Sequence, residues 1–254
     1  MTNQAKVAVV TGASQGIGQG IALRLADDGY RIAILDRQTS DETVQLLKDK
    51  GVDAWQYQVD ISSQASVAEA FTKMDEEFGP AYALVNAAGI FADDPFFETT
   101  VEVWDKVMAV NARGPFLAAQ EAASRMKENG GGRIINILST ASFQGFAYES
   151  AYCASKGAAL LLTKVLALEL AQHGITVNGI GPGTVSTAMG GDYLERGPIA
   201  AHELSRTPMG RFGKPEDIAE AVAFFATSAS WVTGQALYVD GGFAAAGLPL
   251  LQGM

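Results

Sequence analysis

The sequence is poor in cysteine and histidine and has no excess of positive charge. Its single cysteine among 254 residues, Cys153, excludes a disulfide within the chain, so we expect a reducing compartment, the cytoplasm. The two histidines have no acidic or thiol partner at ligand spacing, which predicts that no metal is bound. A formal net charge of −10 argues against nucleic acid or an anionic membrane as a partner, because both select a basic surface.

Long uninterrupted apolar runs are also missing. The most apolar stretch, residues 157–170, contains Lys164 and Glu169, and we judge it too short and too charged to span a membrane. The N-terminus leads into an apolar strand without a basic region or a cleavage site, so we expect no secretory leader. Hydrophobic residues make up 48% of the chain, which is enough for a full globular core.

Apolar segments of strand length alternate with helical patterns along the chain. This alternation predicts an α/β fold in one domain, with a doubly wound, seven-stranded parallel sheet and helices on both faces. The stretch 181–213 is the one long irregular segment, which is typical of a lid. We expect strands at 6–11, 31–35, 54–59, 83–85, 133–138, 176–180 and 236–239, and helices at 16–28, 41–50, 63–78, 100–128, 151–173 and 215–227.

A glycine-rich turn joins the first expected strand to the first helix. Residues 11–18 read TGASQGIG, with glycines at 12, 16 and 18. Glycine permits a tight turn, a close approach of the backbone to a pyrophosphate and close packing of helix on strand. Backbone N–H groups at the helix start can then bind phosphate oxygens. The turn therefore favours dinucleotide binding over a glycine-rich turn without a ligand.

The second expected strand leads directly into Asp36, followed by Arg37. An acidic residue about 20 positions past such a turn accepts hydrogen bonds from ribose hydroxyls and repels a 2′-phosphate, so Asp36 favours NAD over NADP. Gln15 adds no charge to the turn. Arg37 is either a solvated surface residue or a partner for that phosphate, and the strictness of the preference stays open.

Tyr152 and Lys156 lie four residues apart in the segment YCASK, on an expected helix. That spacing places both side chains on one helix face. Ser139 lies thirteen residues before the tyrosine, and Ser142 is the other hydroxyl nearby. Alone, the pair could be an ordinary solvated tyrosine and lysine. Beside a dinucleotide, it could transfer a proton.

Seven motifs in order now resemble the classical short-chain dehydrogenase/reductase family over nearly the whole chain. They are TGASQGIG at 11–18, Asp60 in VDIS, NAAG at 86–89, Asn111, Ser139, YCASK at 152–156 and PGTVST at 182–187. The resemblance implies a Rossmann-type fold, with a cofactor half at about 1–140, a catalytic and substrate half at about 141–254 and a lid at about 188–210.

The resemblance also implies functional residues. The implied catalytic set is Asn111, Ser139, Tyr152 and Lys156. The implied cofactor-binding set is Gly12, Ser14, Gln15, Gly16, Ile17, Gly18, Asp36, Asp60, Ile61, Asn86, Ala87, Gly89, Tyr152, Lys156, Pro182, Gly183, Val185 and Thr187. The expected substrate contacts are Ser139, Gln144, Glu149 and Tyr152.

We therefore expect an NAD-dependent enzyme that interconverts a secondary alcohol (a polyol, a sugar or a small hydroxy compound) and its ketone. Tyr152 would move the proton, with its pKa lowered by Lys156 and the positive nicotinamide ring. Ser139 would stabilise the substrate oxygen, and Asn111 would hold a water linked to Lys156. Two alternatives stay open: an NADPH-dependent 3-oxoacyl-[acyl-carrier-protein] reductase, which residues 210–242 also resemble, and a non-catalytic NAD-binding regulator.

The expected helix 151–173 is apolar nearly all round. One side can pack on the sheet, and the other suggests a subunit interface rather than a wholly internal helix. The resemblance favours a homo-oligomer, either a dimer or a tetramer.

Overall fold

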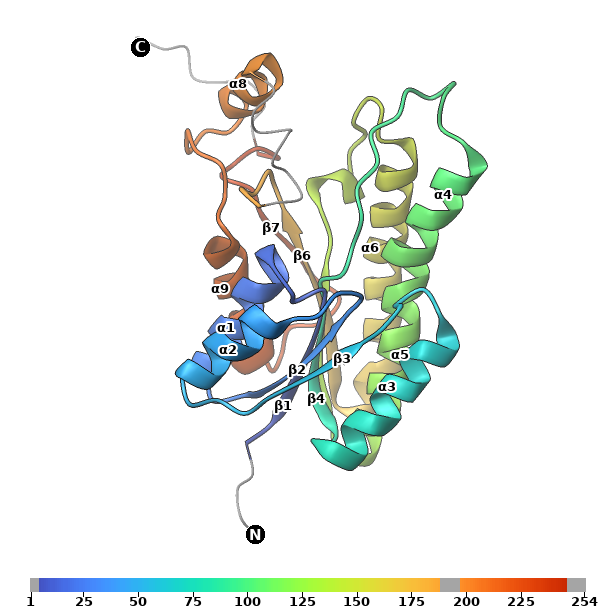
Figure 1. Ribbon diagram of the computed structural model, residues 1–254. Coiled ribbons are helices and arrows are strands. Elements are labelled where there is room, and N and C mark those ends of the chain that lie inside the picture. The colour runs from blue at the N-terminus through green and yellow to red at the C-terminus, as the bar shows by residue number, and fades with distance from the viewer. Residues whose placement is uncertain (1–4, 188–196, 246–254) are drawn as a thin grey trace.

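The computed structural model describes residues 5–187 and 197–245, and it confirms the doubly wound parallel sheet (Figure 1). The strands lie in the order β3-β2-β1-β4-β5-β6-β7, and every neighbouring pair is parallel. Their bounds are β1 Val7–Thr11, β2 Arg31–Asp36, β3 Ala54–Gln58, β4 Ala81–Asn86, β5 Gly132–Ile137, β6 Ile175–Pro182 and β7 Ala236–Val239.

Helices cover both faces of the sheet (Figure 1). On one face lie α1 (Gly16–Asp27), α2 (Asp41–Asp49) and α9 (Pro215–Thr227), and on the other α3 (Gln64–Glu77), α5 (Gly114–Glu128) and α6 (Ser150–Leu170). Successive side chains of a strand point to opposite faces, so each central strand feeds two cores. In β2, Ile34 packs into the first core and Leu35 into the second.

The expected helix at 100–128 is divided in the structure. Helix α4 (Val101–Met108) continues into a π-helical turn (Ala109–Arg113) before α5 begins. Asn111 lies in this turn, where its amide accepts a hydrogen bond from Ile90 N at 2.8 Å and donates one to Ile90 O at 2.8 Å. A π turn inserts one extra residue into a helix, and here it directs Asn111 toward the segment that follows β4.

The irregular stretch expected at 181–213 is partly regular. Strand β6 extends to Pro182, and α8 (Gly197–Ser205) lies beyond the carboxyl ends of the strands (Figure 1). Residues 188–196 of the expected lid lie outside the described residues. The described part of the segment expected to form a lid is therefore α8 and the turn that follows it.

The segment Ser150–His173 consists of α6 and a short 3₁₀ turn (Ala171–His173). It corrects the expectation that the most apolar stretch is too short and too charged to span a membrane. This helix is long and apolar enough, by length and composition, to cross a membrane. Its inner face, however, buries Ala159, Thr163 and Ala167. Because that face packs on the sheet, we interpret the segment as a core helix with one side left uncovered.

A chain of buried polar side chains ties α6 to the sheet. The Asn86 amide donates to Asn136 Oδ1 at 2.8 Å, and Asn136 Nδ2 donates to Thr163 Oγ1 at 2.8 Å. The Thr163 hydroxyl then donates to Ala159 O at 2.8 Å. All three polar side chains are 3% exposed or less, so each needs its partner inside the protein.

The substitution Asn136→Ala should lower the free energy of unfolding by about 2 kcal/mol, because it leaves the Asn86 amide without its best acceptor and opens a small cavity. Urea unfolding followed by circular dichroism measures the change. The control Gln45→Ala removes an exposed side chain on α2 and should change stability by less than about 0.5 kcal/mol. Equal effects of the two substitutions would contradict the assignment.

Candidate active site

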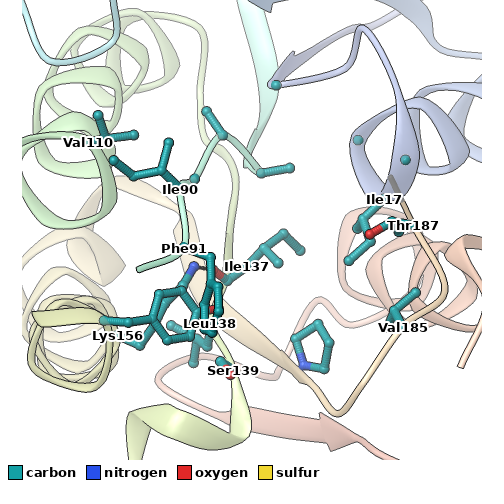
Figure 2. A pocket seen from close by; sticks show the side chains of 18 of the residues that line it. Ile17, Ile90, Phe91, Val110, Ile137, Leu138, Ser139, Lys156, Val185 and Thr187 are labelled. Atoms are coloured by element: carbon teal, nitrogen blue, oxygen red, sulfur yellow. Dashed lines mark hydrogen bonds between the residues drawn. The ribbon is translucent and has the colours of Figure 1, made fainter. Parts of the chain in front are cut away.

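One large cleft lies at the carboxyl ends of the parallel strands and has a volume of about 670 Å³. It lies where the strand order reverses, between β1 and β4, which is where open α/β sheets bind ligands. Figure 2 shows Ile17, Val185 and Thr187 on one side of the cleft and Phe91 and Lys156 on the other. The cleft therefore joins the glycine-rich turn to the expected reacting groups.

The glycine-rich turn has the geometry of a phosphate site. Gly12 and Gly16 have φ angles of 70° and 61°, and a Cβ on Gly12 would lie 2.6 Å from Ala88 Cα. A Cβ on Gly18 would overlap Gly12 O. Helix α1 begins after Gln15, whose side chain does not accept from the first N–H groups of the helix. Those N–H groups are available to phosphate oxygens, so the residues present fit a dinucleotide.

Asp36 stands beside this turn and lines the cleft. Its carboxylate accepts from Ser14 N at 2.9 Å and from Gln38 N at 3.0 Å, one bond at each oxygen. Each oxygen keeps a lone pair for a ribose hydroxyl. Arg37 lines the same end of the cleft, so both residues that bear on the choice between NAD and NADP lie at this site.

Asp60 lies farther along the same end. Its Oδ1 accepts from the Ser62 backbone N–H at 2.9 Å and from the Ser62 hydroxyl at 2.6 Å. These hydrogen bonds, with smaller effects of Arg37 and Arg113, lower the pKa of the Asp60 carboxyl below its ordinary value. Asp60 is therefore a fixed anionic acceptor at neutral pH.

Three polar side chains meet at the other end of the cleft. Tyr152 and Lys156 come from α6, and Ser139 comes from the segment after β5. Lys156 Nζ donates to Ile137 O at 2.9 Å and lies 5.7 Å from the centre of the Tyr152 ring. The ring of Phe91 meets that of Tyr152 edge to face, with centres 5.0 Å apart. The tyrosine is thus held between the lysine and an aromatic wall.

The pKa values here differ from the expectation that Lys156 lowers that of Tyr152. Burial raises the pKa of Tyr152 to about 12, although a hydrogen bond with Ser139 opposes the rise and Glu149 adds to it. Burial also lowers the pKa of Lys156 to about 8. Removal from water disfavours the charged form of each group. The protein groups alone therefore keep the proton on the phenol.

Ser139, rather than Ser142, faces the cleft. Ser139 Oγ accepts from Ala141 N at 3.1 Å, so the turn after β5 fixes its position. The Ser142 hydroxyl donates to Ser139 O at 2.6 Å and lies 3.0 Å from the Tyr238 hydroxyl. These contacts hold it away from the cleft.

Three expected site residues do not line the cleft, and the other expected residues do. Asn86 is turned into the sheet, toward Asn136. The Asn111 amide is bonded to Ile90, and it also donates to Ser155 Oγ at 3.1 Å. The Gln144 amide nitrogen is buried among the described residues with no hydrogen-bond partner. Asn86 and Asn111 therefore support the cleft from behind, and Gln144 does not reach it.

Asn111 and Lys156 nevertheless converge on one place. The position that a Cβ would take on Gly89 lies 3.4 Å from Asn111 Oδ1 and 3.7 Å from Lys156 Nζ. Only glycine leaves this space open between the two polar atoms. A water there would have an acceptor on one side and a donor on the other.

The sequence reasoning missed several residues that line the cleft near Tyr152. They are Ile90, Phe91, Asp93, Phe146 and Glu203. The first three follow β4 directly, so their place after a strand end was a usable signal. Glu203 lies on α8, within the segment expected to be irregular. No sequence motif indicated that this residue lines the cleft.

Glu149, an expected substrate contact, does line the cleft. Burial raises the pKa of its carboxyl to about 7, with added repulsion from Glu203 and Asp93. Its carboxylate has no hydrogen bond or ion pair to any other described side chain or backbone group. Glu203, by contrast, accepts a hydrogen bond from Thr184 Oγ1 at 2.7 Å.

A doubly wound sheet whose cleft joins a phosphate-binding turn to a Tyr/Lys pair is typical of nicotinamide-dependent oxidoreductases. The chain belongs to the short-chain dehydrogenase/reductase family: a family model described as enoyl-(acyl carrier protein) reductase matches residues 12–244. It is an oxidoreductase of a family that uses NAD(P).

Characterised and solved relatives cover nearly the whole chain. It is 38% identical to 2-(S)-hydroxypropyl-CoM dehydrogenase 3 of Xanthobacter autotrophicus, over 96% of this chain and 100% of that one. It is 36% identical to a 3-oxoacyl-[acyl-carrier-protein] reductase of Staphylococcus aureus, over 93% and 97%. A provisionally assigned 2-deoxy-D-gluconate 3-dehydrogenase of Agrobacterium tumefaciens, solved with bound NADP, superposes with a TM-score of 0.90 at 36% identity, over 96% and 98%.

The raised pKa of Glu149 predicts how stability depends on pH. Its ordinary value is 4.5 and its folded value about 7, so the folded state holds this proton more tightly. The contribution therefore destabilises the fold progressively as pH rises from 4.5 to 7. Glu149→Gln should stabilise the protein at pH 8 by about 1 kcal/mol, after allowance for solvent screening, and have little effect at pH 4.5.

Thermal unfolding at both pH values measures this. Glu128→Gln, at the exposed end of α5, is the matched control and should show no such pH dependence. A Glu149→Gln effect of equal size at pH 4.5 and pH 8 would show that the carboxyl is not perturbed in the fold.

Proposed function

We propose that this protein is a cytoplasmic, NAD-dependent oxidoreductase that interconverts a secondary alcohol (a polyol, a sugar or a small hydroxy compound) and its ketone. The observation that carries the proposal is the meeting of Ser139, Tyr152 and Lys156 in one cleft with a phosphate-binding turn. In the part of the chain that the structure describes, no cluster of His, Cys, Asp and Glu side chains is suited to hold a metal ion.

The residues of the turn, together with Asp36 and Asp60, would hold the dinucleotide. When bound, the nicotinamide accepts or supplies the hydride on carbon. Tyr152 takes the hydroxyl proton in oxidation and returns it in reduction. Ser139 holds the substrate oxygen and stabilises the charge that develops on it.

Lys156 acts as the neighbouring cation. Its pKa of about 8 leaves it largely protonated at neutral pH, but burial keeps the Tyr152 pKa high. Formation of the phenolate therefore needs the additional positive charge of the oxidised nicotinamide. The space over Gly89 would hold a water between Asn111 and Lys156, through which the proton leaves the cleft.

A second candidate is reduction of 3-oxoacyl groups on an acyl carrier protein. The relative from Staphylococcus aureus and the description of the family model favour it. Asp36 disfavours it, because a carboxylate there repels the 2′-phosphate of NADPH. The net charge of −10 also opposes docking of an acidic carrier protein.

We also propose that the protein is a homo-oligomer. On the outer face of α6, Leu161, Val165 and Leu168 are 63%, 48% and 82% exposed, and Phe116 of α5 is 43% exposed. Apolar side chains gathered on a helix face are stabilised when a second copy covers them. Light scattering of the purified protein distinguishes a dimer or a tetramer from a monomer.

Tyr152→Phe should lower kcat/KM for alcohol oxidation at least a thousandfold, because phenylalanine has no hydroxyl to take the proton. Turnover is measured from the absorbance of the reduced nicotinamide across secondary alcohols and polyols. Binding of NAD, measured by calorimetry, should change less than threefold. The control Tyr57→Phe removes an exposed hydroxyl on the edge strand β3 that donates to Glu69. Tenfold or smaller loss in Tyr152→Phe would contradict the assignment.

The cofactor preference is a separate test. Wild type should show kcat/KM for NAD at least tenfold above that for NADP, and Asp36→Ala should reduce that ratio at least tenfold, because the substitution removes the repulsion of a 2′-phosphate. Asp49→Ala, at the end of α2, is the control for loss of a surface carboxylate. A wild-type preference for NADP would favour the carrier-protein reductase instead.

A further inference from the structure

The far end of the cleft, beyond Tyr152, combines an aromatic wall with three carboxyls, those of Asp93, Glu149 and Glu203. Phe91 and Phe146 line it together with Glu149. Phe146 also packs against Phe243, with ring centres 6.0 Å apart, so this wall is held from behind. The cleft and the Tyr152 hydroxyl define this end as a ligand-binding region independently of its acidic residues.

The backbone directs Glu149 into this region. Tyr148 has a φ of 72°, the only positive value among described non-glycine residues, and this turn precedes the first residue of α6. Glu149 occupies the N-cap position, yet its carboxylate does not accept from the helix N–H groups. It lies three residues before Tyr152, on the same helix face. A strained turn thus places a carboxyl beside the reacting hydroxyl instead of at the helix end.

That carboxyl is a hydrogen-bond acceptor without a donor. No described group donates to it, whereas Asp36 and Asp60 each accept from backbone N–H groups. A partly buried carboxylate without a partner destabilises the fold. Such a group at the reacting end of a cleft is best explained by a donor that the substrate supplies.

We propose that Glu149 is a specificity-determining residue: it selects substrates with a neutral or positively charged hydrogen-bond donor on the carbon next to the carbinol, and it rejects an anionic group there. This inference rests on the proposed function. The donor, a hydroxyl or an ammonium group, bonds to the carboxylate while the reacting hydroxyl meets Ser139 and Tyr152. The phenyl rings of Phe91 and Phe146 cover the intervening carbons. A carboxylate or sulfonate at the same place would be repelled.

An isosteric substrate series tests the proposal. In CH₃–CHOH–CH₂–X, X is methyl (2-butanol), hydroxyl (1,2-propanediol), ammonium (1-amino-2-propanol) or carboxylate (3-hydroxybutyrate). With wild type and NAD at pH 8.5, where Glu149 is ionised, kcat/KM for the diol and the amino alcohol should each exceed that for 2-butanol at least tenfold. The value for 3-hydroxybutyrate should be at least tenfold below that for 2-butanol. A best value for the carboxylate or for 2-butanol overturns the proposal.

The variant Glu149→Gln separates charge recognition from general positioning. The ratio of kcat/KM for the amino alcohol to that for 2-butanol should fall at least tenfold, and the ratio for 3-hydroxybutyrate to 2-butanol should rise at least tenfold. Glu149→Leu should lower the ratio for the diol at least tenfold as well. Unchanged ratios, with all four values falling together, overturn the proposal. The control Glu128→Gln should leave every ratio within twofold of wild type.

The wild-type series needs no variant, so poor folding of a Glu149 variant leaves the proposal testable. Failure of the proposed function gives a different result: no member of the series, and no ketone counterpart, is turned over with NAD or NADP although the dinucleotide binds. Turnover in a different order leaves the proposed function intact and removes only the role of Glu149.

Discussion

The close approach of the first and fourth strands at their carboxyl ends is the contact on which the site depends. Thr11 Oγ1 accepts from Ala87 N at 3.0 Å and from Ala88 N at 3.1 Å, which joins the end of β1 to the segment after β4. Gly12 then passes so near Ala88 that no side chain fits between them. Because the phosphate-binding turn follows β1 and Phe91 follows β4, this contact sets the distance between the turn and that side of the reacting end.

Burial gives the two ends of the cleft different electrostatics. At the nucleotide end, Asp36 and Asp60 are partly exposed or exposed, and backbone N–H groups hold their carboxylates. At the reacting end, burial drives Tyr152 and Lys156 toward their neutral forms. The nucleotide end is therefore ready to bind a dinucleotide, whereas Tyr152 is still protonated and cannot yet remove a proton from a substrate. The positive ring of an oxidised nicotinamide would complete the site, which would couple cofactor binding to proton transfer.

Much of the fold and site follows from sequence because strand ends converge in a parallel sheet. Once the strands are placed, the turn at Gly12, Asp36 and Ser139 must share one edge, and they do. The π turn at Asn111 was missed, although Gly114 and Pro115 follow it directly and such residues interrupt a helical pattern. The expectation that Lys156 lowers the Tyr152 pKa missed the larger effect of burial, since residue spacing reports neighbours but not the loss of water around them.

Glu149 shows how binding function and stability oppose one another in this fold. At a helix N-cap, a side-chain oxygen that accepts from the first N–H groups stabilises the helix, but the Glu149 carboxylate does not accept from them. The turn at Tyr148 instead commits the side chain to the cleft, where its charge is disfavoured. The native state therefore forgoes a stabilising cap and accepts an unfavourable charge at the same residue. A ligand that donates to the carboxylate, as proposed, would offset the unfavourable charge, and its binding would then stabilise this part of the fold.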